Sequence, residues 1–277
     1  MAEDIEILQK EAEEGNASSQ EKLGRCYYDG TGVEQNYEKA VEWFTKSASQ
    51  GDSDAQTYLG QCYFYGEGVT QDYAKAIEWY IKAAEQGHFF SQKTLFKLYA
   101  RGKYVPLDSE KSLYWAKKVA EQGDVECQLL LGTGVMQNNI ISIEWLTKAA
   151  EQGNSDAQLQ LGMEYFLGDN VSQNFEKAIY WLRMADDQRN FINQDGEQRY
   201  LQHYLQHCRM IGQSYLNLKD YVNAIDWFTK AAEQGDSESQ FRLGQCYYER
   251  KEVEKAIYWM KQAAAQGDPR AKMIFGL

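Results

Sequence analysis

Side chains able to bind a metal or to carry out catalysis are few in this sequence, and the strongest group lies in its last third. His203 and His207 are four residues apart, a spacing that places both on one face of a helix, and Cys208 follows directly after them. Imidazole and thiolate groups are ligands that zinc prefers, so a metal-binding protein or an enzyme centred on these residues is one hypothesis. Two ligands do not complete a site, and such pairs are more often ordinary surface or core residues. We therefore expect no metal and no cofactor.

Two short motifs also suggest chemistry. Gly30-Thr31-Gly32 and Gly66-Glu67-Gly68 look like phosphate-binding loops, but a dinucleotide fingerprint needs a preceding strand and a third glycine at the start of the helix. Ser19 and Lys22 match the Ser-x-x-Lys motif of β-lactamases, whereas the companion Ser-Asp-Asn and Lys-Thr-Gly motifs are absent from the chain. The sequence therefore predicts no catalytic residues, and we expect that the protein is not an enzyme.

The elements that carry these residues belong to one repeated pattern. Tryptophans recur at intervals of 36, 36, 30, 36, 46 and 32 residues, and a glutamine follows each of them seven residues later. The tryptophans are Trp43, Trp79, Trp115, Trp145, Trp181, Trp227 and Trp259. A nearly fixed period of this size is typical of an array whose units bury their apolar faces only by stacking on their neighbours.

Each unit of the repeat has the pattern of two helices joined by a turn. In the clearest copy, Ala55, Leu59 and Tyr63 recur four residues apart, and the stretch 76–84 repeats apolar residues at intervals of three and four. These intervals are typical of amphipathic helices. Gly66 and Gly68 separate the two patterns, and glycine ends helices because it readily adopts left-handed backbone angles.

The combined pattern, AQxxLGxxYxxGxGVxQD followed by KAIEWxxKAAEQG, resembles the Sel-one-like repeat (SLR), a relative of the tetratricopeptide repeat. The resemblance covers nearly the whole chain. It implies an all-α protein, a right-handed α-solenoid of about seven helix-turn-helix repeats with half-repeat caps, and one domain over residues 1–277. The predicted divisions are a cap helix at 1–15, repeats at 16–51, 52–87, 88–123, 124–153, 154–188, 189–235 and 236–267, and a C-terminal half-repeat at 268–277.

Departures from the pattern in the third and fourth repeats affect the expected packing. In the third, Phe96 replaces the glycine at which two helices pack closely, and Tyr104 replaces the second glycine of the turn, so we expect looser or shifted packing there. In the fourth, six residues are missing, and Gly132-Thr133-Gly134-Val135 aligns either with the turn or with Leu-Gly. We favour the turn, with a shortened first helix.

Charge and composition narrow the classes of partner and the location. A net charge of −12 argues against nucleic acid, whose binding depends on Lys and Arg, and equally against anionic membrane surfaces. No stretch approaches the roughly 20 apolar residues of a membrane span. The N-terminus lacks a basic segment followed by an apolar run, so it is no secretory signal, and we expect a cytoplasmic protein with free thiols. We expect a monomer, with self-association through the C-terminal half-repeat as the alternative.

The resemblance implies that a partner binds on a concave face lined by the first helix of each repeat. Lys93, Lys97 and Arg101 form a basic ladder at four-residue spacing on that face. An apolar patch and five further candidates complete the predicted partner-binding set, with Leu159, Met163, Phe166 and Leu167 in the patch and Phe64, Tyr65, Arg209, Phe241 and Tyr248 elsewhere. Apolar anchors beside charges suit a peptide or protein ligand.

The sequence therefore predicts a non-enzymatic protein–protein interaction scaffold or adaptor that binds a protein or an acidic-apolar peptide in its groove. The resemblance also allows an immunity protein that neutralises a secreted toxin. A simpler interpretation remains open for the groove, in which Leu159 and Phe166 are core residues and the lysines form a solvated surface.

Overall fold

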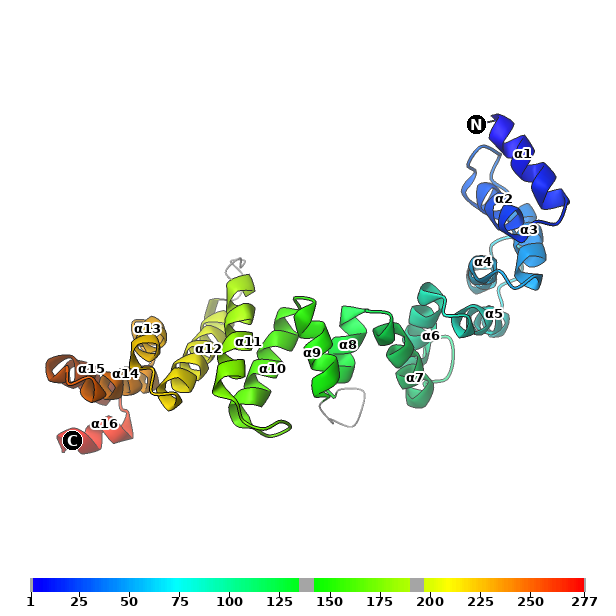
Figure 1. The fold of residues 1–277 in the computed structure, drawn as a ribbon. Coiled ribbons are helices and arrows are strands. Elements are labelled where there is room, and N and C mark those ends of the chain that lie inside the picture. The colour runs from blue at the N-terminus through cyan, green and yellow to red at the C-terminus, as the bar shows by residue number, and fades with distance from the viewer. Residues whose placement is uncertain (1, 135–141, 190–196, 277) are drawn as a thin grey trace. The chain divides into compact units, whose positions relative to one another are not determined.

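The computed structural model describes residues 2–134, 142–189 and 197–276, and within these ranges it contains sixteen α-helices and no β-strand (Figure 1). Helix α1 (Ala2–Glu13) precedes seven helix pairs, and α16 (Pro269–Phe275) follows them. The pairs are α2 (Ala17–Asp29) with α3 (Tyr37–Ser49), α4 (Ser53–Tyr65) with α5 (Tyr73–Glu85), α6 (Phe89–Arg101) with α7 (Ser109–Glu121), α8 (Val125–Gly132) with α9 (Ile143–Glu151), α10 (Ser155–Leu167) with α11 (Phe175–Arg189), α12 (Glu197–Asn217) with α13 (Tyr221–Ala232), and α14 (Ser237–Glu249) with α15 (Val253–Ala265). The predicted all-helical repeat fold is confirmed.

The chain forms two compact units, residues 1–127 and 128–277. The same local signals begin and end the helices in both. Asn16, Asp52, Asn154 and Asp236 each accept a hydrogen bond from the backbone N–H three residues later, at 2.8–2.9 Å, which satisfies one of the free donors at a helix start. At the other end, Gly66 adopts φ 78° and stops α4. The described part of the chain has no helix long and apolar enough to cross a membrane.

The two helices of a pair approach each other closely at one position. A Cβ placed on Gly60 would lie 2.9 Å from the ring of Tyr80, so only glycine fits there. In the third pair, Phe96 takes the glycine position and Ala116 takes the position of Tyr80. Both are buried, with 7% and 0% of their surfaces exposed, so the position remains filled although the glycine is missing. In the second repeat the large side chain, Tyr80, lies on the second helix, whereas in the third repeat the large side chain, Phe96, lies on the first helix.

The fourth helix pair, α8 with α9, shows which position of the repeat Gly132 occupies. Gly132 lies in the last turn of α8, and a Cβ on it would be 2.8 Å from Cγ of Leu146. It is therefore the close-packing glycine, and the alignment of Gly132 with the turn was wrong. The predicted shortening of the first helix is confirmed, because α8 has 8 residues and α4 has 13. Gly134 follows at φ 75°, and Val135 lies outside the described residues.

A buried amide joins successive repeats. Gln56 donates from Nε2 to the carbonyl of Ala48 in the preceding helix, at 3.3 Å, and accepts a hydrogen bond from Gln86 at 2.8 Å. Gln86 is one of the glutamines that follow the tryptophans by seven residues. The same pairing of two glutamines occurs in four other repeats, at Gln20 with Gln50, Gln92 with Gln122, Gln128 with Gln152, and Gln240 with Gln266.

The tryptophans lie at varying depth. Trp115 is buried, with 6% of its surface exposed. Trp43, Trp79 and Trp227 are half-buried, and the lysine three residues later places its Nζ 3.9, 4.0 and 3.5 Å from the ring centre. A cation over an indole ring is attracted by its electron-rich face. Each of these tryptophans is therefore partly packed in the protein and also contacts a lysine ammonium group through the face of its ring.

Candidate partner-binding sites

Four of the predicted residues meet in one pocket of the first unit. Phe64 and Tyr65 come from the end of α4, and Lys97 and Arg101 come from the second half of α6. The cavity has a volume of about 360 Å³. We call it the basic pocket, and its other lining residues are Gln61, Tyr80, Phe90, Thr94, Leu98, Lys103 and Tyr104.

The aromatic wall of the basic pocket includes a residue that breaks the repeat. Tyr104 occupies the position that Gly68 has in the preceding repeat. A Cβ atom added to Gly68 would lie 2.3 Å from the carbonyl oxygen of Tyr37. A side chain cannot fit in that arrangement. Tyr104 instead lies against Tyr73, the equivalent of Tyr37, with ring centres 4.9 Å apart, and meets Phe64 edge to face at 5.0 Å. Aromatic pairs in such geometries stabilise each other, so the wall is held in place.

Positive charge collects at the same pocket. Lys97, Arg101 and Lys103 line it, all are exposed, and no carboxylate is among the lining residues. None of the three forms an ion pair with a described residue at 4 Å or less. Lys103 Nζ lies 4.8 Å from the ring centre of Tyr104. On a chain of net charge −12, this pocket is suited to attract an anion.

Lys93, the third member of the predicted basic ladder, does not line the basic pocket. It forms ion pairs with Asp124 and Glu126, and 25% of its side chain is exposed. Burial alone would raise the pKa of Asp124, but the hydrogen bonds from Lys93 and from the backbone N–H of Cys127 outweigh burial and lower that pKa below its usual value. The structure thus gives Lys93 a role in joining α6 to the next repeat.

The predicted apolar patch in the second unit is mostly packed. Leu159, Met163 and Phe166 are half-buried and lie against a core cluster of Ile179, Leu182, Met210 and Ile211. Leu167 is the exposed member, at 51%. These positions favour the simpler interpretation, in which Leu159 and Phe166 belong to the core.

Arg209 is committed to carboxylates within its own unit. It pairs with Asp236 at 2.9 Å and with Glu238 at 4.0 Å. Together with Phe166 it lines a small cavity of about 250 Å³. The ion pairs neutralise its charge, so this cavity lacks the free positive charge of the basic pocket.

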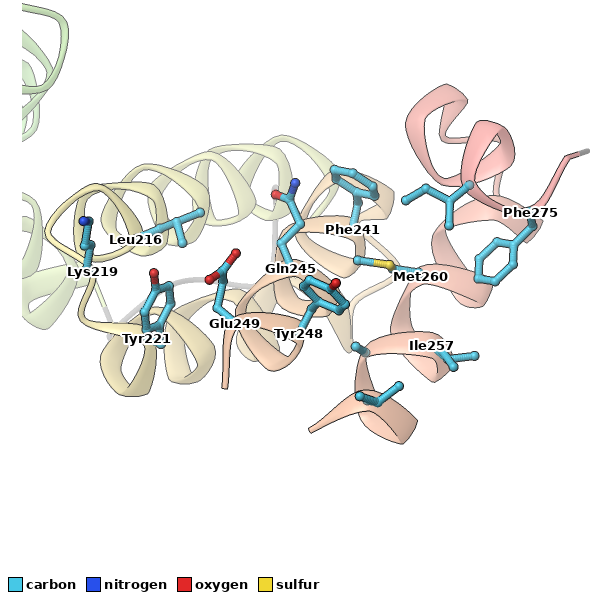
Figure 2. Close-up of a pocket in the computed structure, with 13 residues that line it drawn as sticks. Leu216, Lys219, Tyr221, Phe241, Gln245, Tyr248, Glu249, Ile257, Met260 and Phe275 are labelled. Carbon is cyan, nitrogen blue, oxygen red and sulfur yellow. The ribbon is translucent and has the colours of Figure 1, made fainter. Parts of the chain in front are cut away.

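Phe241 and Tyr248 line a larger cavity of the second unit, of about 880 Å³. Figure 2 shows both on α14, with Met260 of α15 and Phe275 of α16 also at the cavity. We call it the apolar cavity. Its other walls include Val253 and Ile257 of α15 and Ile274 of α16, and the predicted set, drawn from the first helices of full repeats, contains none of them.

Two of the three proposed metal ligands are buried. His207 and Cys208 are buried, with 3% and 0% exposure, and burial raises the pKa of the Cys208 thiol to about 11. Burial therefore opposes the thiolate form in which a cysteine binds a metal. The side chain of His203 lies outside the described residues. Among the residues that are described, no three His, Cys, Asp or Glu side chains gather as a metal site would require.

Known repeat families match most of this chain. Sel1 repeats are recognised at residues 17–52, 53–88, 95–124, 129–154 and 155–188, and a tetratricopeptide repeat match covers residues 209–271. The Sel1 matches extend over more than half of the sequence, and the chain belongs to the Sel1 repeat family. In the last two full pairs, short turns with Lys219 and Lys251 at φ 61° and 64° replace the glycine turn.

Two solved structures are similar to the chain at the level of fold and sequence. One is c5321, a protective antigen present in uropathogenic Escherichia coli strains and displaying an SLR fold, with 31% identity and a TM-score of 0.58. That match covers 98% of this chain and 66% of the other, so the chain spans about two thirds of the length of that relative. The other is a Sel1 repeat protein from Oxalobacter formigenes, with 26% identity, a TM-score of 0.54, and coverage of 76% and 92%. No curated protein sequence matches the chain.

Proposed function

We propose that this protein is a non-enzymatic scaffold or adaptor, and that the basic pocket holds an acidic segment of a partner protein that also carries a large apolar side chain. Repeat proteins of the Sel1 and tetratricopeptide type generally mediate protein–protein interactions. The observation that carries the proposal is the grouping of Lys97, Arg101 and Lys103 around an aromatic wall without a carboxylate.

The two components of the pocket have separate roles. Phe64, Tyr65 and Tyr104 offer aromatic surface on which an apolar side chain is removed from water, and buried aromatic contacts supply much of the affinity in protein interfaces. The cations fix the register of the acidic residues and speed association. A cavity of about 360 Å³ accommodates one or two side chains, so the rest of the segment lies along the surface of α4 and α6.

The test uses peptides selected from a random library on the intact protein. We expect selected peptides to combine Asp or Glu with Phe, Tyr, Trp or Leu, and their binding is then measured by fluorescence polarisation. Lys97→Glu combined with Arg101→Glu should weaken binding at least about tenfold, since reversal of two contacting charges adds repulsion to lost attraction.

The control makes the same change of net charge elsewhere. Lys117→Glu combined with Lys261→Glu alters two exposed lysines outside the pocket and should leave the affinity close to that of the wild type. Equal weakening by both double variants would attribute binding to overall charge and overturn the assignment of the pocket. Selected peptides without acidic residues would overturn the proposed ligand chemistry.

A further inference from the structure

The basic pocket gathers exposed aromatic surface from three segments of the first unit. Tyr65 at the end of α4, Phe90 at the start of α6 and Tyr104 in the turn after α6 all line it. These residues are 63%, 49% and 37% exposed. Large apolar side chains that lie exposed around one cavity mark a binding site more often than single ones scattered over a surface. The pocket therefore has aromatic surface available to a flat ring of a ligand.

Polar groups follow one face of α6 at the same pocket. Thr94, Lys97 and Arg101 are spaced by three and four residues, which places them on one side of the helix, and all three line the cavity. Lys103 adds a third cation just after the helix ends, with its Nζ 4.8 Å from the ring centre of Tyr104. The C-terminal ends of α4 and α6 each contribute roughly −0.5 of an elementary charge. The three cations outweigh both helix ends, so the pocket keeps a positive charge.

The charge and the size of the pocket together narrow its ligand. A carboxylate carries one negative charge on two oxygens, whereas the phosphate of a phosphorylated residue carries about −1.5 to −2 at pH 7 and has three acceptor oxygens. A cavity of about 360 Å³ accommodates one or two side chains, so the negative charge that meets three cations must be concentrated on few groups. A phosphate on an aromatic ring supplies the charge and the ring in one side chain.

We propose that the basic pocket binds a phosphotyrosine side chain of the partner, so that phosphorylation of that tyrosine switches the interaction on. This inference rests on the proposed function and narrows its ligand to one modified residue. The ring of the phosphotyrosine lies against the exposed aromatic surface, and Lys97, Arg101 and Lys103 hold the phosphate. The planar guanidinium of Arg101 is shaped to contact two phosphate oxygens, while the lysines act as point charges. An unmodified tyrosine gains the aromatic contact alone.

Three fluorescein-labelled peptides test the inference on the full chain by fluorescence polarisation. They share Gly-Ala flanks and differ only in a central tyrosine, phosphotyrosine or phosphoserine. The phosphotyrosine peptide should bind at least about tenfold more tightly than the tyrosine peptide, because the phosphate forms up to about three charge-assisted hydrogen bonds. It should also bind more tightly than the phosphoserine peptide, which carries the same phosphate without the ring.

Two variants separate the phosphate contact from the ring contact. Lys97→Gln combined with Arg101→Gln should remove most of the gain from phosphorylation, and the same changes at the exposed Lys117 and Lys261, outside the pocket, should preserve it.

Tyr65→Ala should weaken the phosphotyrosine peptide and leave the phosphoserine peptide nearly unchanged. Tyr114→Ala is the matched control, because Tyr114 is 52% exposed and does not line the pocket. Circular dichroism confirms that each variant is folded.

Three outcomes would overturn the inference. The first is equal affinity for the phosphotyrosine and tyrosine peptides. The second is equal affinity for the phosphotyrosine and phosphoserine peptides, which would make the pocket a general anion site. The third is a gain from phosphorylation that survives the loss of Lys97 and Arg101, which would place the phosphate elsewhere.

The proposed function fails separately from this inference. Library peptides with Asp or Glu that bind and respond to Lys97→Glu with Arg101→Glu, while phosphotyrosine brings no gain, would overturn the phosphotyrosine inference alone. Tight phosphotyrosine binding, with no library peptide bound, would instead overturn the unmodified acidic segment and support the phosphotyrosine site. Absence of binding by every peptide would overturn both.

Discussion

Gln86 donates a side-chain hydrogen bond to Oε1 of Gln56 at 2.8 Å. Gln56 in turn donates a hydrogen bond from Nε2 to the carbonyl of Ala48 at 3.3 Å. Only 5% of the Gln56 surface is exposed. The carbonyl belongs to the second helix of the preceding repeat, so the two bonds connect both helices of one repeat to its neighbour. This link explains why glutamine recurs at two fixed places in the pattern.

Gln56→Leu should destabilise the first unit by about 1–3 kcal/mol, because the Ala48 carbonyl and the Gln86 amide both lose a buried partner while the size of the side chain hardly changes. Urea unfolding followed by circular dichroism measures the change. Gln9→Leu is the control, since Gln9 is exposed and, among the described residues, its side chain donates a hydrogen bond only to the exposed Glu13. A midpoint for Gln56→Leu that equals that of the control would show that the link contributes nothing.

A second prediction concerns Phe96 and Ala116, which are large and small where the preceding repeat has the small Gly60 and the large Tyr80. Phe96→Gly should cost at least about 3 kcal/mol, because it removes a buried ring and leaves a cavity. Ala116→Tyr alone should also destabilise, through overpacking. The double variant recreates the Gly60 and Tyr80 arrangement, so its loss should be clearly smaller than the sum of the single losses. Additive losses in chemical unfolding would mean that the two positions do not share one packing space.

The ion pair of Lys93 with Asp124 predicts a pH dependence. A carboxyl whose pKa is lower in the folded chain stabilises the fold above its unfolded pKa, and the contribution is lost as the pH falls through the folded value. Lys93→Met should therefore cost about 1–3 kcal/mol near neutral pH, and the difference from the wild type should shrink in acid, as Asp124 becomes protonated.

Unfolding in urea at a series of pH values checks this behaviour. Lys117→Met serves as the control, because Lys117 is exposed and has no ion pair with a described residue. A difference between Lys93→Met and the wild type that stays constant into acid would contradict the pairing. Because Lys93 has this structural contact, its reversal would confuse a binding test, and the pocket variants are therefore limited to Lys97 and Arg101.

The regular parts of the fold could be predicted from the sequence because each signal is local. Capping residues, turn glycines and apolar spacing recur in register, and they locate helix pairs without knowledge of distant contacts. The error at Gly132 has a physical cause: a glycine inside a helix and a glycine in a turn look the same in sequence, and only the contact with Leu146 separates them. The exchange of Phe96 and Ala116 was missed because the two positions were not compared across helices.

The candidate sites were predictable only in part. Register places Phe64, Tyr65, Lys97 and Arg101 on first helices, and these four residues do line one pocket. The position of a residue in the repeat does not reveal whether its charge is already paired with a carboxylate. Lys93 and Arg209 were therefore predicted to bind a partner, although both form ion pairs within the chain. The position also does not reveal burial, which assigns Leu159 and Phe166 largely to the core.

Tyr104 shows how little change separates a repeat without a pocket from the repeat that carries the basic pocket. At Gly68 the turn lies directly on the preceding repeat, while Tyr104, at the same position one repeat later, becomes a wall of the basic pocket. The proposed recognition surface is modular, since it depends on one turn position and on the first helix beside it. For protein engineering, grafting the third repeat's turn and the outward residues of α6 into another repeat should move the pocket along the array without a new fold.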